Sequence, residues 1–506
     1  MTREGFIEGR RCAPMRLGRV LILGLGASGR AMVDYCLPLV GERVEALAIA
    51  AGARTDASEA FAAQAAAAGA HVAFGDDAVA ELVAALPVRE QNPAFDICVP
   101  SPGIPQSSAL YASGAATSAE TVSEVEFAWR ESAADSRWAA VTGTNGKTTV
   151  ASLVAHLMRE AGTRAAAVGN IGDTCIAAVA AGRTDVYVAE VSSYQLASTR
   201  QFAPNAAALL NITPDHLHWH GTFEAYRDAK LKLLANLADI PGSVAVLDAT
   251  NDIVRAEVRR LRALGDERGF AYVPLGTAEG LAGDMRARCG SHNAAFIAAD
   301  DTLTVALGGR EHALVRADEL LIEGAHNAGN ALAAAACALA LGADEASVAR
   351  GLRTFAPLEH RIEPCGSVAG VTCVNDSKAT NVDATLKALA SFPGTGVIAL
   401  LGGDDKGTDL APLVEAAHAH TRAVVCFGEA GSRFSEAFSG SVSEDFSVLR
   451  AAHLEDAFDA ALAAARPGDV VLLSPACASF DEFGSFEERG RVFKALVAQR
   501  AARAEG

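Results

Sequence analysis

Residues 139–150, with the sequence A-A-V-T-G-T-N-G-K-T-T-V, constrain the fold of this chain more than any other stretch. An apolar lead-in runs into a polar, glycine-rich turn, and the helical pattern of Val150–Met158 follows directly. A strand, a glycine-rich loop and a helix start form a phosphate cradle, because backbone N–H groups and the helix N-terminus face the anion. We therefore expect Lys147 to neutralise β- and γ-phosphate oxygens and the Thr148 hydroxyl to bind Mg²⁺.

This loop departs from the strict G-x-x-x-x-G-K-[ST] spacing. That pattern requires a glycine where the chain has Val141, and the first glycine is Gly143. The alternative interpretation is a tight glycine turn before an ordinary helix. A short motif does not decide between the two until its surroundings agree.

Composition restricts the class of protein. The chain has 506 residues, enough for about three domains of roughly 150 residues each. Its net charge of −18 argues against a general nucleic-acid or membrane-surface binder, which needs a positive field. Ten cysteines without a C-x-x-C pair indicate reduced thiols in a cytosolic protein. No apolar run is long enough to span a membrane, and residues 1–16 are predicted to be a loose leader rather than a signal peptide.

A second glycine motif lies near the N-terminus. Val20–Leu23 predicts a buried strand, and G-L-G-A-S-G over residues 24–29 opens a helix from about Ala27. A nicotinamide-binding site would also need an acidic residue at the end of the second strand. The expected second strand, Val44–Ala50, ends without one. This counts against NAD and leaves open another diphosphate, such as a nucleotide sugar.

The rest of the first region has a strand that enters the turn V-P-S-P-G-I-P, which ends at Pro105. This turn predicts either a ligand-binding strand exit or a rigid corner. A helix is expected over Glu120–Arg130, and the polar stretch Glu131–Arg137 is the first predicted domain boundary.

Several polar groups follow predicted strands in the second region. Glu190 ends a strand near the phosphate loop, where a Mg²⁺ ligand is expected. The three histidines of D-H-L-H-W-H could suggest zinc, but no cysteine lies nearby, so one imidazole on Mg²⁺ is the preferred interpretation. Lys230 and Lys232 cannot both face the core of their helix. In the long helix from Gly324 to Leu339, His326 and Asn330 share a face.

The third region alternates strands and helices. Strands are expected at Val371–Asn375, Val397–Leu401, Ala423–Phe427 and Asp469–Leu473. Three of their exits carry unusual polar groups, which predicts one crevice edge. The fold class is therefore α/β, with a Rossmann-like N-terminal domain, a central mononucleotide-binding α/β domain and a Rossmann-like C-terminal domain.

The ordered series of motifs resembles the Mur ligase family. The runs that carry this resemblance are G-L-G-x-S-G, S-P-G, G-T-N-G-K-T-T, G-N-I-G, E-V-S-S-Y-Q-L, N-I-T-P-D-H-L, Y-R-D-A-K, H-N-x-x-N, H-R, D-S-K-A-T-N, L-L-G-G-D-x-K and S-P-A-C-A-S-F-D. They cover nearly the whole chain in the family's order. Two of these runs, D-S-K-A-T-N and S-P-A-C-A-S-F-D, point to the glutamate-adding branch.

The resemblance implies three domains, at residues 1–137 for a UDP-linked substrate, 138–324 for ATP and Mg²⁺, and 325–506 for ATP and the incoming amino acid. It implies that ATP phosphorylates the carboxylate of UDP-N-acetylmuramoyl-L-alanine and that the amino group of D-glutamate displaces phosphate. It also implies a cytoplasmic monomer without nucleic-acid partners or membrane insertion. Whether the glutamate is the D or the L enantiomer is left open by sequence.

The resemblance also implies site residues. Lys147, His216, Lys230 and Lys378 resemble catalytic residues, and the Mg²⁺ ligands would be Thr148, Glu190, His216 and a carbamylated Lys230. Nucleotide contacts are implied for Gly143, Thr144, Asn145, Gly146, Lys147, Thr148, Thr149, Asn327, Asn330, Arg361 and Asp376. Substrate contacts are implied for Ala27, Ser28, Gly103, Asn170, Thr380, Lys406, Ser479, Phe480 and Phe486.

Three alternatives stay open. They are another amide ligase, such as a folylpolyglutamate synthetase-like enzyme or a different Mur ligase, a nicotinamide-dependent oxidoreductase, and a non-catalytic nucleotide sensor. The missing acid after the second strand disfavours the oxidoreductase, and intact Lys147, Glu190, His216 and Lys230 disfavour the sensor. The leader and residues 251–320 are not explained by any motif.

Overall fold

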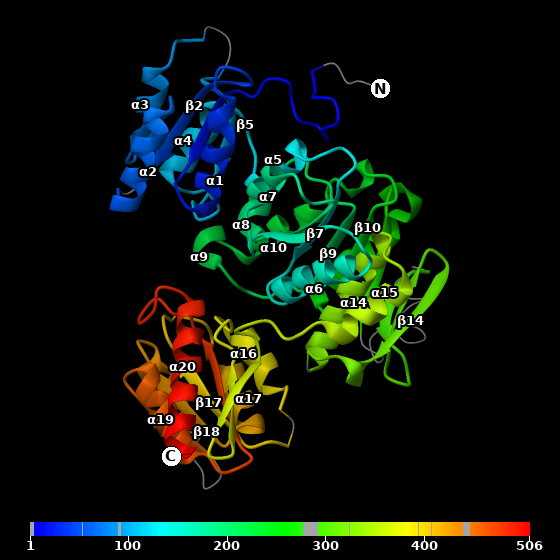
Figure 1. Cartoon of the computed structure of the whole chain (residues 1–506), viewed down its shortest axis with the longest axis vertical. Coiled ribbons are helices and arrows are strands. Elements are labelled where there is room, and N and C mark those ends of the chain that lie inside the picture. The colour runs from blue at the N-terminus through cyan, green and yellow to red at the C-terminus, as the bar shows by residue number, and fades with distance from the viewer. Residues whose placement is uncertain are drawn as a thin grey trace. The chain divides into compact units, whose positions relative to one another are not determined.

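The computed structural model describes residues 5–52, 54–89, 93–276, 292–322, 324–392, 394–405, 407–438 and 446–505, and Figure 1 shows their helices and strands. The chain separates into two compact units. The first contains the described residues up to Leu320 together with Gly329–Thr354, and the second contains Leu321–Ala328 and the chain from Phe355 onward. Three sheets with flanking helices confirm the α/β fold class. The domain limits at residues 137 and 324 stay a prediction.

The first sheet belongs to the N-terminal part of the first unit. Its strand order is β3-β2-β1-β4-β5, and every neighbouring pair is parallel. The order reverses between β1 and β4, so the turns that follow these two strands are neighbours, as in other doubly wound sheets. The bounds are β1 Gly18–Leu23, α1 Ala27–Cys36, β2 Val44–Ala51, α2 Asp56–Ala67, β3 His71–Phe74, α3 Ala78–Ala85, β4 Phe95–Pro100, α4 Ala109–Ala116, β5 Ser118–Thr121 and α5 Glu124–Glu131.

Two expectations for this region are wrong. The helix expected over Glu120–Arg130 begins only at Glu124. Ser118–Thr121 instead forms a strand that pairs with β4, and the Ser123 hydroxyl caps the helix by accepting a hydrogen bond from the backbone N–H of Glu126. Residues 5–16 of the leader are not loose, because their backbone is hydrogen-bonded to the chain after α5. Arg11 N donates to Ser132 O over 2.9 Å, and Ala134 N donates to the leader's Gly9 O over 2.9 Å.

The second sheet has nine strands in the order β14-β13-β12-β11-β10-β9-β6-β8-β7. It is parallel from β7 to β12 and ends in the antiparallel strands β13 and β14. Its strands are β6 Arg137–Thr142, β7 Ala165–Gly169, β8 Val186–Glu190, β9 Ala206–Leu209, β10 Val244–Asp248, β11 Ala271–Leu275, β12 Ala294–Ile297, β13 Thr302–Leu307 and β14 Arg310–Arg316. Its helices are α6 Lys147–Glu160, α7 Cys175–Ala181, α8 Ser193–Ala197, α9 Leu217–His220, α10 Phe223–Leu231, α11 Asp252–Leu264, α14 Ala325–Ala340 and α15 Glu345–Thr354.

The third sheet lies in the second unit, with the order β15-β16-β20-β17-β18-β19. All neighbours are parallel except β15 and β16. The adjacent strands β16, β20 and β17 therefore present their exits side by side at one edge of the sheet, and a crevice at that edge stays a prediction. The bounds are β15 Glu363–Val368, β16 Val371–Asn375, α16 Val382–Leu389, β17 Val397–Gly402, α17 Ala411–His420, β18 Ala423–Phe427, α18 Gly431–Phe438, β19 Ser447–Arg450, α19 Leu454–Ala464, β20 Val470–Ala476 and α20 Phe486–Glu505.

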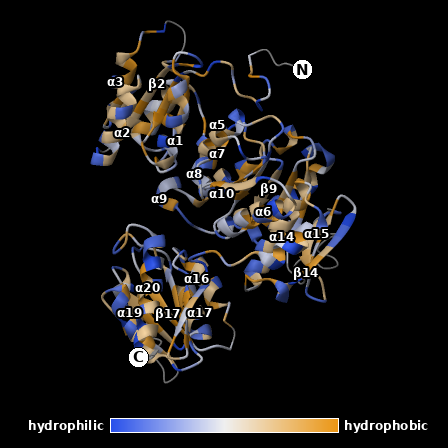
Figure 2. Ribbon diagram, in the orientation of Figure 1, coloured by the Kyte–Doolittle hydropathy of each residue, from blue (hydrophilic) through white to orange (hydrophobic). Residues whose placement is uncertain are grey.

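The sheets are the cores of the units. Strands β6, β9 and β17 are buried along their whole length or nearly so, which explains their continuous apolar sequences. Figure 2 shows hydrophobic residues prevailing in strands such as β2 and β17. In the described part of the chain, no helix combines the length and the apolar character needed to cross a bilayer.

Candidate active site

The predicted phosphate loop joins β6 to α6. Its last glycine, Gly146, has φ 86° and directly precedes the helix. A side chain there would be strained, and its Cβ would lie 2.6 Å from Asn330 Oδ1, so the position requires glycine. Lys147 Nζ folds back onto the loop and donates to Thr144 O over 2.8 Å. Thr148 and Thr149 occupy the first turn of α6, where free N–H groups attract anions.

The loop is fixed by the chain that leaves the neighbouring strand β9. Asn145 N donates to the Asn211 side chain over 2.8 Å, and Asn211 Nδ2 returns a bond to Asn145 O over 3.1 Å. The Thr144 hydroxyl lies 2.8 Å from the Tyr226 hydroxyl and accepts a bond from Thr213 N. These contacts hold the loop open and in place, as a preformed phosphate cradle requires.

Glu190 ends β8, which pairs with β6 at Val141. The carboxylate is 2% exposed, and its Oε1 accepts a bond from Asn170 Nδ2 over 2.9 Å. Its other oxygen, Oε2, is buried without a hydrogen-bond partner among the described residues. An unsatisfied buried carboxylate oxygen is costly, so this atom fits a ligand such as a metal ion or its bound water.

Lys230, near the end of α10, is 1% exposed. Its Nζ donates to Gly143 O over 2.8 Å and lies 4.8 Å from the centre of the Tyr226 ring. Burial lowers the pKa of this amine well below its usual value, and the nearby charge of Lys147 lowers it further, whereas Asp215 and Glu190 act in the opposite direction. Lys232 is exposed, and its amine donates to Ala197 O.

His216 adopts the left-handed conformation, with φ 54°, which is uncommon for a residue other than glycine. Its Nε2 lies 3.5 Å from Asp215 Oδ2, and its ring lies 5.0 Å from that of Tyr194. His218 is exposed. His220 shares a 2.9 Å hydrogen bond with Ser193, and burial lowers its pKa to about 4, so it is a neutral structural group. Among the described residues, no three His, Cys, Asp or Glu side chains form a metal-binding group, which gives the zinc alternative no support.

The remaining predicted residues of the first unit fall in two places. Asn330 lies on α14 against Gly146, as described above. Asn327, one turn earlier on the same helix, is grouped with the second unit instead. Ala27 and Ser28 begin α1, and Gly103 lies in the turn after β4. Because β1 and β4 are adjacent and parallel, these three residues lie at the same sheet edge.

In the second unit, Asp376 directly follows β16. Its Oδ2 accepts a 2.7 Å bond from the Ser474 hydroxyl, and its Oδ1 accepts one from Ile362 N. Burial raises the pKa of this carboxyl to about 7, although Ser474 and the charge of Arg361 oppose the shift. Lys378 Nζ lies 3.9 Å from the centre of the Phe486 ring, a cation–π contact.

Other predicted residues of this unit differ in exposure. Ser479 is buried, whereas Phe480 is 71% exposed. Thr380 lies in the turn before α16, where its N–H donates to Lys378 O. Lys406 lies outside the described residues.

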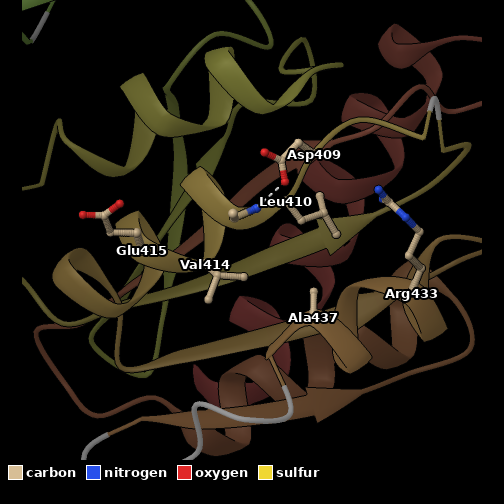
Figure 3. A pocket seen from close by; sticks show the side chains of 7 residues that line it. Asp409, Leu410, Val414, Glu415, Arg433 and Ala437 are labelled. Atoms are coloured by element: carbon tan, nitrogen blue, oxygen red, sulfur yellow. Dashed lines mark hydrogen bonds between the residues drawn. The ribbon is translucent and has the colours of Figure 1, made fainter.

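A separate hollow in this unit lies between α17 and α18 (Figure 3). Leu410, Val414 and Ala437 give it an apolar lining, and Arg433 at its edge pairs with Asp405 over 3.0 Å. None of its described lining residues belongs to the predicted site.

Sequence reasoning missed the residues that support the site. Asn211 and Tyr226 fix the phosphate loop, and Arg489 fixes two loops of the second unit. Asn211 carried a readable signal, because it is a polar residue at the exit of a strand next to β6. Tyr226 and Arg489 carried none, since their partners are distant in the chain.

The site combines a glycine-rich loop between a buried strand and a helix, a carboxylate with one unpaired buried oxygen among the described residues, and a buried lysine. This combination defines a nucleotide-dependent enzyme of the α/β class. Two family descriptions match the chain. They are the Mur ligase middle domain over residues 141–338 and the Mur ligase, glutamate ligase domain over residues 360–477. The chain belongs to the Mur ligase family.

The relatives within the family are more specific. A UDP-N-acetylmuramoylalanine--D-glutamate ligase of Thermoanaerobacter pseudethanolicus is 36% identical over 81% of this chain and 86% of that protein. The enzyme of the same name from Bordetella parapertussis is 40% identical over 72% of each chain.

Solved structures share the fold. A pseudomurein peptide ligase type C from Methanothermus fervidus matches with a TM-score of 0.54 and 17% identity over 95% of this chain and 99% of that one. The folylpolyglutamate synthase of Mycobacterium tuberculosis, solved with ADP and AMPPCP, matches with a TM-score of 0.52 and 17% identity over 71% of this chain and 91% of that one.

Proposed function

We propose that this chain is an ATP-dependent ligase that joins D-glutamate to the carboxylate of UDP-N-acetylmuramoyl-L-alanine, a step of peptidoglycan precursor synthesis. The observation that carries the proposal is the meeting of three groups at one edge of the central sheet. They are the Lys147 loop, the open carboxylate oxygen of Glu190 and the amine of Lys230. The names of the relatives supply the two substrates.

The reaction has two chemical steps. A carboxylate oxygen of the UDP-linked substrate attacks the γ-phosphorus of ATP, the bond to ADP breaks, and an acyl phosphate forms. The amino group of D-glutamate then attacks the acyl carbon, phosphate leaves with its oxygen, and the nitrogen loses a proton. Both steps bring anions together, so the main task of the protein is charge neutralisation and alignment.

Residues of the first unit would serve the phosphate chemistry. The backbone of Gly143–Thr149 would hold the phosphates of ATP, and Lys147 would turn from Thr144 O to the β- and γ-phosphate oxygens. Asn330 beside Gly146 is placed for a nucleotide contact. Ala27, Ser28 and Gly103 would take the UDP moiety, and Asn170 would contact the substrate close to Glu190.

Mg²⁺ fits the residues that surround the loop. The open oxygen of Glu190, the Thr148 hydroxyl and the His216 imidazole would hold it, with phosphate oxygens and water to complete the shell that Mg²⁺ prefers. When bound, the ion neutralises charge that develops on the transferred phosphoryl group. Because phosphate oxygens would supply part of this shell, we expect Mg²⁺ to bind together with ATP.

Lys230 fits a carbamate. A neutral amine adds CO₂ to give an N-carboxylate and a proton, and the lowered pKa of this lysine favours the neutral form. The product would be an anion at the end of a buried stem, beside Gly143. Such an anion can help to position Mg²⁺, which the unmodified amine cannot do.

Residues of the second unit would serve the amino acid and the nucleotide. Lys378 and Ser479, on loops that follow adjacent strands, would contact the acyl phosphate and the glutamate carboxylates, and Thr380 and the phenylalanines Phe480 and Phe486 would complete that site. Asn327, Arg361 and Asp376 would contact ATP. Lys406 is proposed for the same loop system on the resemblance alone.

The substrate assignment is tested by measuring ATP-dependent phosphate release with UDP-N-acetylmuramoyl-L-alanine and a panel of amino acids. We expect D-glutamate to stimulate release at least about a hundredfold more than L-glutamate, D-aspartate or glycine, because each misplaced or missing carboxylate leaves a buried polar partner unpaired. Equal stimulation by L-glutamate, or no response to D-glutamate, would show that the enzyme is a different amide ligase.

A further inference from the structure

Arg489 on α20 is fully buried, yet all four hydrogen bonds of its guanidinium end on uncharged oxygen atoms. Nε donates to the Ser377 hydroxyl and Nη2 to Ser377 O, each over 2.9 Å. Nη1 donates to Ala478 O over 2.9 Å, and Nη2 also donates to Cys477 O over 3.1 Å. One side chain therefore ties together two segments about a hundred positions apart in the chain.

These segments carry proposed site residues. Ser377 lies immediately before Lys378, and Ala478 lies immediately before Ser479. Their strands, β16 and β20, are adjacent and parallel, so both segments leave the sheet at the same edge. Arg489 donates to a backbone oxygen of each segment, Ser377 O and Ala478 O. Each of these residues directly precedes a proposed substrate contact.

A third loop is packed against the same group. Gly403 follows β17, and a Cβ on it would lie 2.3 Å from Ala478 O and 3.0 Å from Arg489 Nη1. Asp404 and Ala478 exchange two backbone hydrogen bonds, of 3.0 and 3.1 Å. The close approach of the Gly403 backbone thus depends on where the guanidinium holds Ala478.

A buried charge without an anion in contact is expensive, and burial lowers the pKa of Arg489 to about 10. If this position served only packing, an apolar side chain of similar volume would fill it at a smaller cost in folding free energy. The planar fork of arginine, however, can bond acceptors on two segments at once, whereas a lysine amine is a single point. The arrangement therefore favours a role in geometry.

We propose that Arg489 is a positioning residue for the amino-acid substrate, because it fixes the Ser377 and Ala478 segments so that Lys378 and Ser479 face the glutamate carboxylates. This inference rests on the proposed function. It adds a residue that makes no contact with substrate and acts through the two segments that it joins.

The test compares the same substitution at two positions of α20. Arg489→Lys keeps the charge but breaks the fork, and Arg500→Lys changes an arginine that pairs with Asp459 and Glu455 instead. Ser377→Ala removes the hydroxyl that accepts the bond from Nε and that itself donates to Phe486 O over 2.8 Å. For each enzyme, the KM for D-glutamate is measured together with the rate at which hydroxylamine traps the acyl phosphate when D-glutamate is absent.

We expect Arg489→Lys to raise the KM for D-glutamate by at least about tenfold, with the trapping rate within about threefold of wild type, since small displacements of aligned groups have large effects. Ser377→Ala should shift the KM in the same direction by less, and Arg500→Lys should not shift it. If Arg489→Lys does not fold, the result for Ser377→Ala decides the question.

An equal fall of both activities, or an unchanged KM, would overturn the positioning role. A wild-type enzyme that forms no product with D-glutamate would instead overturn the proposed function. The two failures are therefore distinguishable in the same set of assays.

Discussion

Replacing Lys147 by alanine is expected to lower kcat/KM by roughly a thousandfold without unfolding the protein. Lys147 is the cation of the phosphate loop, and its Nζ donates to Thr144 O in the same loop. Removing it leaves the phosphates of ATP without their nearest positive charge during transfer. The loop itself should persist, because Asn211, Thr213 and Tyr226 hold it through other atoms.

The matched control is Arg159→Ala, on the last turn of the same helix. Arg159 donates to Ala165 O over 3.1 Å and is remote from the loop. This variant should keep its activity within about threefold, as surface changes usually do. Near-wild-type activity in Lys147→Ala, with circular dichroism unchanged in both variants, would show that Lys147 does not stabilise the transferred phosphate.

Replacing Lys230 by alanine is expected to abolish turnover, with partial recovery when a short carboxylic acid such as acetate is added. The substitution removes the amine that would carry the carbamate and leaves space beside Gly143. An added carboxylate can occupy that space and supply the missing anion. Turnover is followed by phosphate release across a range of acetate concentrations, and wild-type enzyme in the same acetate series is the control. Absence of recovery at every concentration would count against a carbamate.

Although Lys230 is needed for turnover, its burial is expected to lower the stability of the folded protein near neutral pH. Its pKa is lowered in the folded state, so between that pKa and the usual value of 10.5 the unfolded chain binds a proton that the folded chain does not. In CO₂-free buffer, the stability contributed by this site therefore rises with pH and is complete above 10.5. Lys230→Met should unfold at a higher temperature than wild type near neutral pH, and the difference should shrink as the pH approaches 10.5. A Met variant that is less stable at neutral pH would contradict this.

Much of the fold was predictable because buried parallel strands are short, apolar and bounded by turns. Val371–Asn375 and Ala423–Phe427 have the same bounds in the structure as in the sequence-based expectation. Ser118–Thr121 was missed because a short edge strand next to a helix has no periodicity of its own. The contacts of the leader were missed because they depend on the chain after α5, more than a hundred residues away.

The candidate site divides in the same way. Strand exits could be located from sequence, and sheet order then brings Glu190 and the Lys147 loop to adjacent strands. Burial could not be predicted for Lys230, since helical spacing allowed either lysine of its helix to face inward, and the outcome depends on packing against β6 and Tyr226. Arg489 was invisible for a related reason, because its partners are backbone carbonyls, which sequence does not reveal.

The central claim, that an acyl phosphate links ATP cleavage to amide formation, is tested most directly by isotope transfer. UDP-N-acetylmuramoyl-L-alanine is prepared with a heavy oxygen isotope in its carboxylate, and the enzyme is supplied with ATP and D-glutamate. Each turnover is expected to move one heavy oxygen into the released phosphate, because that oxygen bridges carbon and phosphorus in the intermediate. Phosphate released without the heavy isotope, alongside normal amide formation, would contradict it.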